Sequence, residues 1–119
     1  MIRDNIRFKR SASLAAVNDA CVHNCDGAAS ALIQVDTHAA AVGFQLVAEG
    51  RTSDTSPWIT LGLVPTNSVA LTVPIVITAA FTGIPAFGWR ADTRGISTLR
   101  VRVSARTSGA CTVAIRAAA

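Results

Sequence analysis

The most informative segment for the fold of this protein is Leu99-Arg100-Val101-Arg102-Val103-Ser104-Ala105-Arg106. Aliphatic side chains occupy every second position, and arginine or serine occupies the positions between them. A period of two is the repeat of a β-strand, in which successive side chains point to opposite faces of a sheet. The segment therefore predicts a strand with one face in a core and a cationic face directed toward water or a partner.

Similar alternation recurs along the rest of the chain, between short stretches rich in turn-forming residues. We expect further strands at residues 13–17, 29–36, 42–48, 58–64, 69–78, 86–91 and 111–115. Pro74 requires an edge or a break within 69–78, and Thr107-Ser108-Gly109 predicts a hairpin turn into the last strand. The Ala-rich stretch 12–20 stays open between strand and helix. About seven to nine short strands predict an all-β fold, an antiparallel β-sandwich or jelly-roll-like domain.

Length and composition suit one small domain with a thin core. The chain has 119 residues, which is enough to bury a single core. We expect residues 11–119 to form this domain and residues 1–10 to form an extended basic N-terminal arm. Half of the residues are hydrophobic, but aromatic residues make up 5%, so the core should be aliphatic. Trp58 and Trp89 fall where core aromatics are expected.

Nothing in the sequence predicts a targeting signal or a membrane span. The charged N-terminus is not followed by a continuous apolar segment with a cleavage site. The most apolar stretch, Val69 to Phe81, is interrupted by Pro74 and is too short to cross a bilayer. An odd number of cysteines, three, excludes a complete disulfide framework. We therefore expect a soluble protein assembled in a cytoplasm.

The basic residues favour contact with proteins. The net charge is +4, and Lys9 is the one lysine beside ten arginines. Guanidinium groups are weakly hydrated and pair with carboxylates in two-point geometry, so arginine suits protein interfaces. Nucleic-acid binding is less favoured because the aromatic stacking platforms of single-strand binders are scarce. The arm, in which four basic residues oppose Asp4, is either a solvated tail or a segment that orders on a neighbouring subunit.

The arginines of the predicted strand 99–106 form the leading candidate site. Arg100, Arg102 and Arg106 share one face of that strand, and Arg90 and Arg94 lie on the preceding strand and loop. This face either remains solvated and prevents edge aggregation or docks on acidic patches of a partner subunit, and we favour docking over phosphate binding. The apolar loop 81–87 either caps the core or lies in a subunit contact. The candidate partner-binding residues are Arg3, Arg7, Lys9, Arg10, Arg90, Arg94, Arg100, Arg102 and Arg106.

The motif Cys21-x-His23-x-Cys25 combines residue types that bind metals. On a strand its three side chains share one face, and Asp26, His38 or Cys111 could supply a fourth ligand. Close zinc ligands are usually separated by two to four residues, however, and the chain has no second cysteine pair. We favour the interpretation that these three are small buried residues or turn residues, and we expect no bound metal.

Catalytic chemistry finds little support in the sequence. Cys25 with His38 would be the one Cys/His pair, but nothing marks an oxyanion site and no motif of known mechanism is present. The seven acidic residues are scattered and fit turn caps and salt bridges. We expect neither an enzyme nor a cofactor.

The order of motifs resembles a known family. Val42-Gly43-Phe44-Gln45-Leu46-Val47-Ala48-Glu49-Gly50 precedes a polar loop with Asp54 and then Trp58-Ile59-Thr60-Leu61. Later come 86–92, the strand 95–105, the turn 107–109 and a final Val/Ala strand. This arrangement, covering roughly residues 29–116, resembles a β-sandwich of tailed-bacteriophage virion proteins. It departs from that pattern where Thr55, and not glycine, follows Asp54.

The resemblance implies a role in a virion. The family includes head decoration (cement) proteins, and related domains occur in tail and fibre proteins. It implies a structural protein on the outer capsid surface that binds the major capsid protein as a homo-oligomer, with a trimer favoured, and stabilises the assembled shell. The alternatives are a tail, fibre or head–tail adaptor component and, from another class, a carbohydrate-binding module.

Overall fold

The computed structural model describes residues 10–25, 27–37, 43–66, 74–77 and 88–118. Within these ranges the chain forms ten strands and no helix. The strands are β1 Arg10–Leu14, β2 Ala20–Asn24, β3 Ser30–Thr37, β4 Phe44–Arg51, β5 Ile59–Thr60, β6 Val64–Pro65, β7 Pro74–Ile77, β8 Trp89–Asp92, β9 Thr98–Ala105 and β10 Cys111–Ala118.

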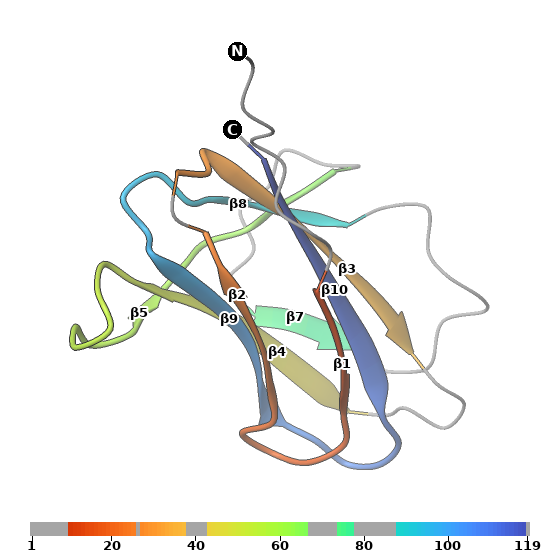
Figure 1. The fold of residues 1–119 in the computed structure, drawn as a ribbon. Helices are drawn as coiled ribbons and strands as arrows, with labels where there is room; N and C mark the ends of the chain where they lie inside the picture. The colour runs from red at the N-terminus through yellow and green to blue at the C-terminus, as the bar shows by residue number, and fades with distance from the viewer. Residues whose placement is uncertain (1–9, 26, 38–42, 67–73, 78–87, 119) are drawn as a thin grey trace.

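The strands form two antiparallel sheets that pack face to face (Figure 1). One sheet has the order β1-β10-β3-β8-β6, and the other has the order β2-β9-β4-β5, with β7 also paired to β4. The predicted all-β antiparallel sandwich is confirmed. The number of strands within the described residues exceeds the expected seven to nine because two of them, β5 and β6, are only two residues long.

The segment 99–105 lies at the centre of one sheet. β9 pairs with β2 on one side and with β4 on the other. Leu99, Val101 and Val103 are fully buried, whereas Arg100 and Arg102 stand on the outer face. The strand and its two faces are therefore confirmed, because a period of two places alternate residues on opposite sides of the pleat.

The core fills the space between the sheets with aliphatic side chains. The second layer contributes the alternate residues of β3 and β10, and Trp89 from β8 is buried as predicted. The largest fully buried side chains are Leu14, Ile33, Leu46, Leu63, Ile75, Leu99, Ile115, Val35, Val101 and Val103. Among the described residues the core is thus aliphatic, as the low aromatic content predicted.

The prediction that Thr107-Ser108-Gly109 closes a hairpin is wrong. β9 lies in the sheet with β2 and β4, whereas β10 pairs with β1 and β3 in the other sheet. The chain therefore crosses between sheets at this turn, and Gly109 has a positive φ of 82°. A turn residue signals a change of direction, but the sequence does not state which strand will be paired afterwards.

The expected strand 58–64 is also wrong. The chain forms β5 at Ile59–Thr60 on the edge of one sheet and β6 at Val64–Pro65 in the other. Ile59 is 52% exposed, and Trp58 is half-buried on the outside of the sandwich and not in its core. An edge strand has one neighbour, so it can be short and can leave a large side chain outside.

The stretch 12–20 contains no helix. β1 ends at Leu14, and the chain turns at Asn18, which has φ 76°. The Asp19 carboxylate accepts hydrogen bonds from the backbone N–H groups of Ala15 and Ala16, both at 3.0 Å. This side-chain acceptor stabilises a tight connection into β2. The apolar loop 81–87 lies outside the described residues.

Candidate functional site

The structure distributes the predicted arginines over two opposite faces of the sandwich. Arg100 and Arg102 lie on the outer face of the β9 sheet, and Arg90 lies on the outer face of the other sheet. Arg94 follows β8 in a loop, and Arg106 follows β9 and donates to the Gly109 carbonyl at 2.9 Å. The predicted arginines do not form one continuous surface. Arg10 begins β1, and Arg3, Arg7 and Lys9 lie outside the described residues.

A buried carboxylate organises the arginines of β9. Glu49 on β4 lies directly opposite Arg100 in the sheet register, and its residue is 8% exposed. Its Oε1 accepts hydrogen bonds from Arg100 Nε at 2.8 Å and from Arg102 Nε at 2.9 Å. Arg102 Nη2 also donates to Oε2 at 3.3 Å, and Nη1 donates to Asn18 Oδ1 at 3.1 Å. Opposite charges placed across neighbouring strands stabilise the sheet and hold both guanidinium groups in place.

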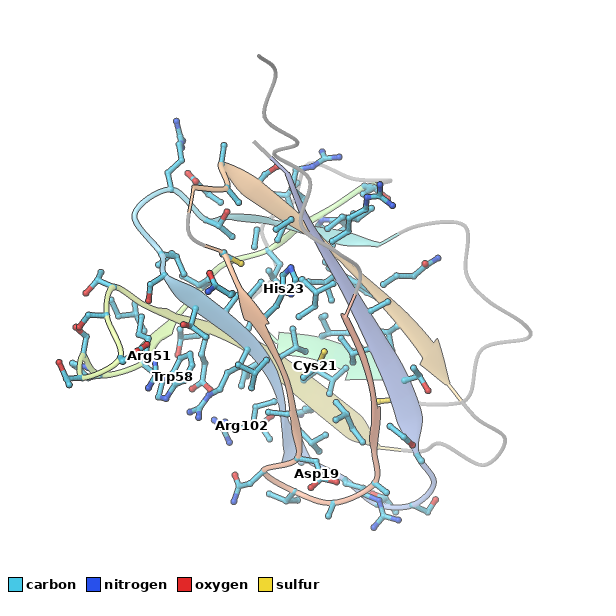
Figure 2. All side chains as sticks on the ribbon, in the orientation of Figure 1. Asp19, Cys21, His23, Arg51, Trp58 and Arg102 are labelled. Atoms are coloured by element: carbon cyan, nitrogen blue, oxygen red, sulfur yellow. The ribbon has the colours of Figure 1, made fainter. Side chains whose placement is uncertain are left out.

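An indole ring extends this cluster toward β5. The Arg100 guanidinium carbon lies 4.1 Å from the Trp58 ring centroid, and that of Arg51 lies 4.3 Å from it. Figure 2 shows Trp58 and Arg51 side by side on the outside of the sheet. Both distances fit cation–π attraction, which is strongest for tryptophan. We call Glu49, Arg51, Trp58, Arg100 and Arg102 the guanidinium–indole platform.

The platform retains an excess of positive charge. Arg100 and Arg102 share the one Glu49 carboxylate, and the Arg51 guanidinium has only the largely exposed Asp54 beside it, 4.0 Å from Nη2, so the three guanidinium groups and Glu49 together carry +2. The Arg51 Nε is buried and has no hydrogen-bond partner in the structure. Buried donors without a partner are costly, and this atom is not accessible to another molecule, so the excess positive charge and the exposed parts of the guanidinium groups are what the platform offers to a carboxylate.

The ion pairs shift the pKa values of both carboxylates involved. The hydrogen bond from Arg102, opposed by burial and assisted by Arg100, lowers the pKa of Glu49 below its ordinary value of 4.5. The side-chain hydrogen bond from Arg94 lowers the pKa of Asp92 to about 2 on the exposed surface. Both groups therefore carry their full negative charge at neutral pH.

The lowered pKa of Glu49 predicts that the platform loses its contribution to folding in acid. The unfolded chain takes up a proton at Glu49 near pH 4.5, whereas the folded chain does so at lower pH, so this contribution is complete above pH 4.5 and lost as pH falls through the folded value. We expect Glu49→Gln to reduce the free energy of unfolding by about 1–2 kcal/mol at pH 7. The difference in stability between the wild type and the variant should become smaller in acid. Urea titrations of both proteins at pH 7 and at pH 3 measure this difference at each pH. An equal loss at both pH values would contradict the assignment, and Asp54→Asn is the control for an exposed carboxylate.

Cys21 and His23 of the motif Cys21-x-His23-x-Cys25 lie on β2, and Cys25 follows the end of that strand. All three side chains are buried, as Figure 2 shows for Cys21 and His23. The Cα atoms of residues two apart on a strand are separated by about 6.6 Å, and those of residues four apart by about 13 Å. The three side chains therefore cannot all reach one ion with metal–ligand bonds of about 2–2.3 Å. Among the described residues no group of three His, Cys, Asp or Glu side chains is placed to hold a metal. Asp26 and His38 lie outside this part of the chain. The favoured interpretation, buried structural residues, agrees with their positions.

The buried cysteines are expected to be unreactive. Cys21, Cys25 and Cys111 form no disulfide and are at most 1% exposed, and burial raises the pKa of Cys111 to about 11. Because the thiolate is the reactive species, a disulfide reagent at pH 8 should label no thiol in the native protein and three after denaturation. Rapid labelling of native protein would contradict the burial of these side chains.

Sequence reasoning missed three members of the platform. Glu49 was placed among scattered acids, Trp58 in the core, and Arg51 in a polar loop. The pattern that could have found them is the cross-strand pairing of β4 with β9, which places Glu49 opposite Arg100 and Arg51 opposite Thr98. Register of this kind depends on which strands are neighbours.

No helix in the described part of the chain is long and apolar enough to cross a membrane.

Comparison with known proteins identifies relatives of the fold. The sequence matches no protein-family model and no curated protein. The structure is similar to a crystal structure of the SPBc2 prophage-derived protein YomS, with a TM-score of 0.71 and 11% identity, covering 100% of this chain and 99% of that one. It is also similar to the PBSX exported protein XepA, with a TM-score of 0.68 and 16% identity, covering 95% of this chain and 39% of that one. At these identities the likeness establishes that the chain shares the fold of these two proteins.

Proposed function

We propose that this chain is a structural protein of a bacteriophage particle that binds the assembled capsid and stabilises it through protein–protein contacts. The likeness to a prophage-derived protein over the full length of both chains supports the phage setting. The observation that carries the binding role is the guanidinium–indole platform, which holds three arginines and a tryptophan on one outer sheet face. Tryptophan and arginine dominate the energetic centres of protein interfaces.

The geometry of the platform supports binding without a large entropic cost. Glu49 and Trp58 hold the guanidinium groups before a partner arrives, so less side-chain freedom is lost on association. The remaining positive charge matches an acidic patch on a capsid subunit and would accelerate association. The exposed side chain of Val22 lies opposite Arg100 on β2 and adds apolar area beside these charges.

Stabilisation of a shell requires contact with more than one subunit. We propose that the chain acts as a homo-oligomer, with a trimer favoured, on the outer surface where major capsid proteins meet. Modest contacts then add because one oligomer engages several subunits at once. A ligand that binds the assembled shell and not free subunits shifts the equilibrium toward the shell.

The test compares particles made with and without this protein. We expect particles lacking it to lose their shells at a lower temperature, and we expect added wild-type protein to restore the original melting temperature. Trp58→Ala should require a concentration at least roughly tenfold higher for the same restoration, because removing an interface anchor typically costs more than 1 kcal/mol. Arg106→Gln, which removes an exposed charge outside the platform, is the matched control. Unchanged melting of particles that lack the protein would reject the stabilising role.

A tail, fibre or head–tail adaptor position is the second candidate. The same fold makes up 39% of the longer PBSX exported protein, so this unit also occurs as one part of a longer chain. Gold-labelled protein in whole particles separates the two, since label on tails would select this candidate. A carbohydrate-binding module is less favoured because two guanidinium groups already lie over the Trp58 ring that a sugar would need.

A further inference from the structure

The outer face of the other sheet carries a second cluster of charged and apolar side chains. Arg116 on β10 lies opposite Leu32 on β3, Leu32 lies opposite Arg90 on β8, and Arg90 lies opposite Val64 on β6. These four side chains cross four neighbouring strands in one line, which we call the outer row. Leu32 and Val64 are 40% and 37% exposed, and both arginines are exposed.

The arginines of the outer row differ from those of the platform because their charges are not compensated. Within the described residues, neither Arg90 nor Arg116 forms an ion pair or a side-chain hydrogen bond. The two arginines stand two strands apart, about 10 Å, because neighbouring strands are separated by about 4.8 Å. Leu32, 40% exposed, lies between these two cations.

A hollow adjoins the row at β6 and β8. It has a volume of about 500 Å³ and is lined in part by Gly62, Val64, Arg90 and the ion pair of Asp92 with Arg94. Val64 and Arg90 belong to both the hollow and the row, so a partner that lies along the row can place a side chain in the hollow. The surface thus offers two cation positions, an apolar centre and an adjoining recess.

We infer that the outer row is a docking surface for a partner protein that presents two carboxylates about 10 Å apart with an aliphatic side chain between them, a spacing set by the strand separation. Charge complementarity selects this partner, since two uncompensated guanidinium groups favour carboxylates. The chain's own N-terminal arm is basic and does not complement the row.

Two other occupants fit less well. Among the acidic side chains that the structure describes, Glu49 and Asp92 are paired with arginines, Asp54 lies 4.0 Å from Arg51, and Asp19 accepts hydrogen bonds from its own turn, so these four offer a second copy no matching acidic patch. A nucleic acid would use the arginines but not Leu32 and Val64, and the row contains no aromatic ring for base stacking. The inference does not depend on the proposed capsid role.

The test uses the isolated chain and defined probes. The probe is a synthetic alanine-based helical peptide with two glutamates seven positions apart, about 10.5 Å along the axis, and a leucine four positions after the first glutamate on the same face. Its binding is followed by the backbone amide chemical shifts of the protein in NMR at two salt concentrations. We expect saturable shifts centred on Leu32, Val64, Arg90 and Arg116. Binding by the double variant R90Q/R116Q should weaken by roughly 3- to 10-fold, because each exposed ion pair contributes little by itself, whereas R106Q should bind as the wild type does.

Each remaining outcome overturns the inference. Shifts confined to Arg100, Arg102 and their neighbours would place the peptide on the platform, and equal loss in R106Q would reduce the effect to net charge. Shifts at the row caused by a twelve-nucleotide DNA, but not by the peptide, would assign it to nucleic acid. Shifts at the row that grow with protein concentration alone would assign it to a second copy. Because no particle is involved, failure here leaves the capsid test unaffected, and the reverse also holds.

Discussion

Leu46→Ala is expected to lower the free energy of unfolding by about 2–5 kcal/mol. Leu46 is fully buried on β4, where it lies opposite Val103 on one side and Ile75 on the other. Removing its side chain leaves a cavity between the two sheets, and a close-packed aliphatic core relaxes only in part around such a void. Chemical denaturation monitored by tryptophan fluorescence measures the loss.

Leu32→Ala is the matched control for this prediction. It makes the same chemical change on the outer face of the other sheet, where the side chain is 40% exposed. We expect a loss of about 0.5 kcal/mol or less there, because surface substitutions away from the core have small effects. If both variants lose similar stability, the assignment of inner and outer faces is wrong.

Gly88→Ala is expected to cost about 2–3 kcal/mol, the upper part of the range for overpacking. A Cβ at this position would stand 2.5 Å from the Ile33 carbonyl oxygen and 3.3 Å from Leu32 Cδ1. Gly88 is also held by Thr66, which accepts from its N–H at 3.0 Å and donates to its carbonyl at 2.9 Å. Neither backbone can move without breaking hydrogen bonds, so β3 and β8 must separate. Urea denaturation gives the loss in stability.

Gly50→Ala provides the comparison for the close approach at Gly88. Its Cβ would stand 2.9 and 3.0 Å from two methyl carbons of the Ile96 side chain. A side chain can rotate away where a carbonyl oxygen cannot, so we expect a smaller loss than at Gly88. A larger loss at Gly50 would show that side-chain packing, and not backbone contact, limits these positions.

The fold class was predictable because it depends on a local repeat. Alternation within β3, β9 and β10 places each residue on one of two faces, and it holds whichever strands are neighbours. The pairing of those strands was not predictable. The turn 107–109 was expected to close a hairpin, yet β9 and β10 lie in different sheets.

The candidate site was predictable in part. Arg100 and Arg102 were expected on an outer face, and they lie there. Their pairing with Glu49 joins residues 51 and 53 positions apart in the chain, so no local pattern contains it. Trp58 was assigned to the core because large aromatic side chains are usually buried, whereas an edge strand and two guanidinium groups keep it on the surface.

The antiparallel β-sandwich and its aliphatic core follow from the sequence alone, because the identity of every second residue fixes which face of a strand is buried. The division of the arginines between a compensated platform and an uncompensated outer row does not follow from it and emerges in the folded chain. That division depends on strand order and register, which bring Glu49 to Arg100 and Leu32 between Arg90 and Arg116. Contacts between distant segments follow from the packing of the whole chain, and no short stretch of sequence specifies them.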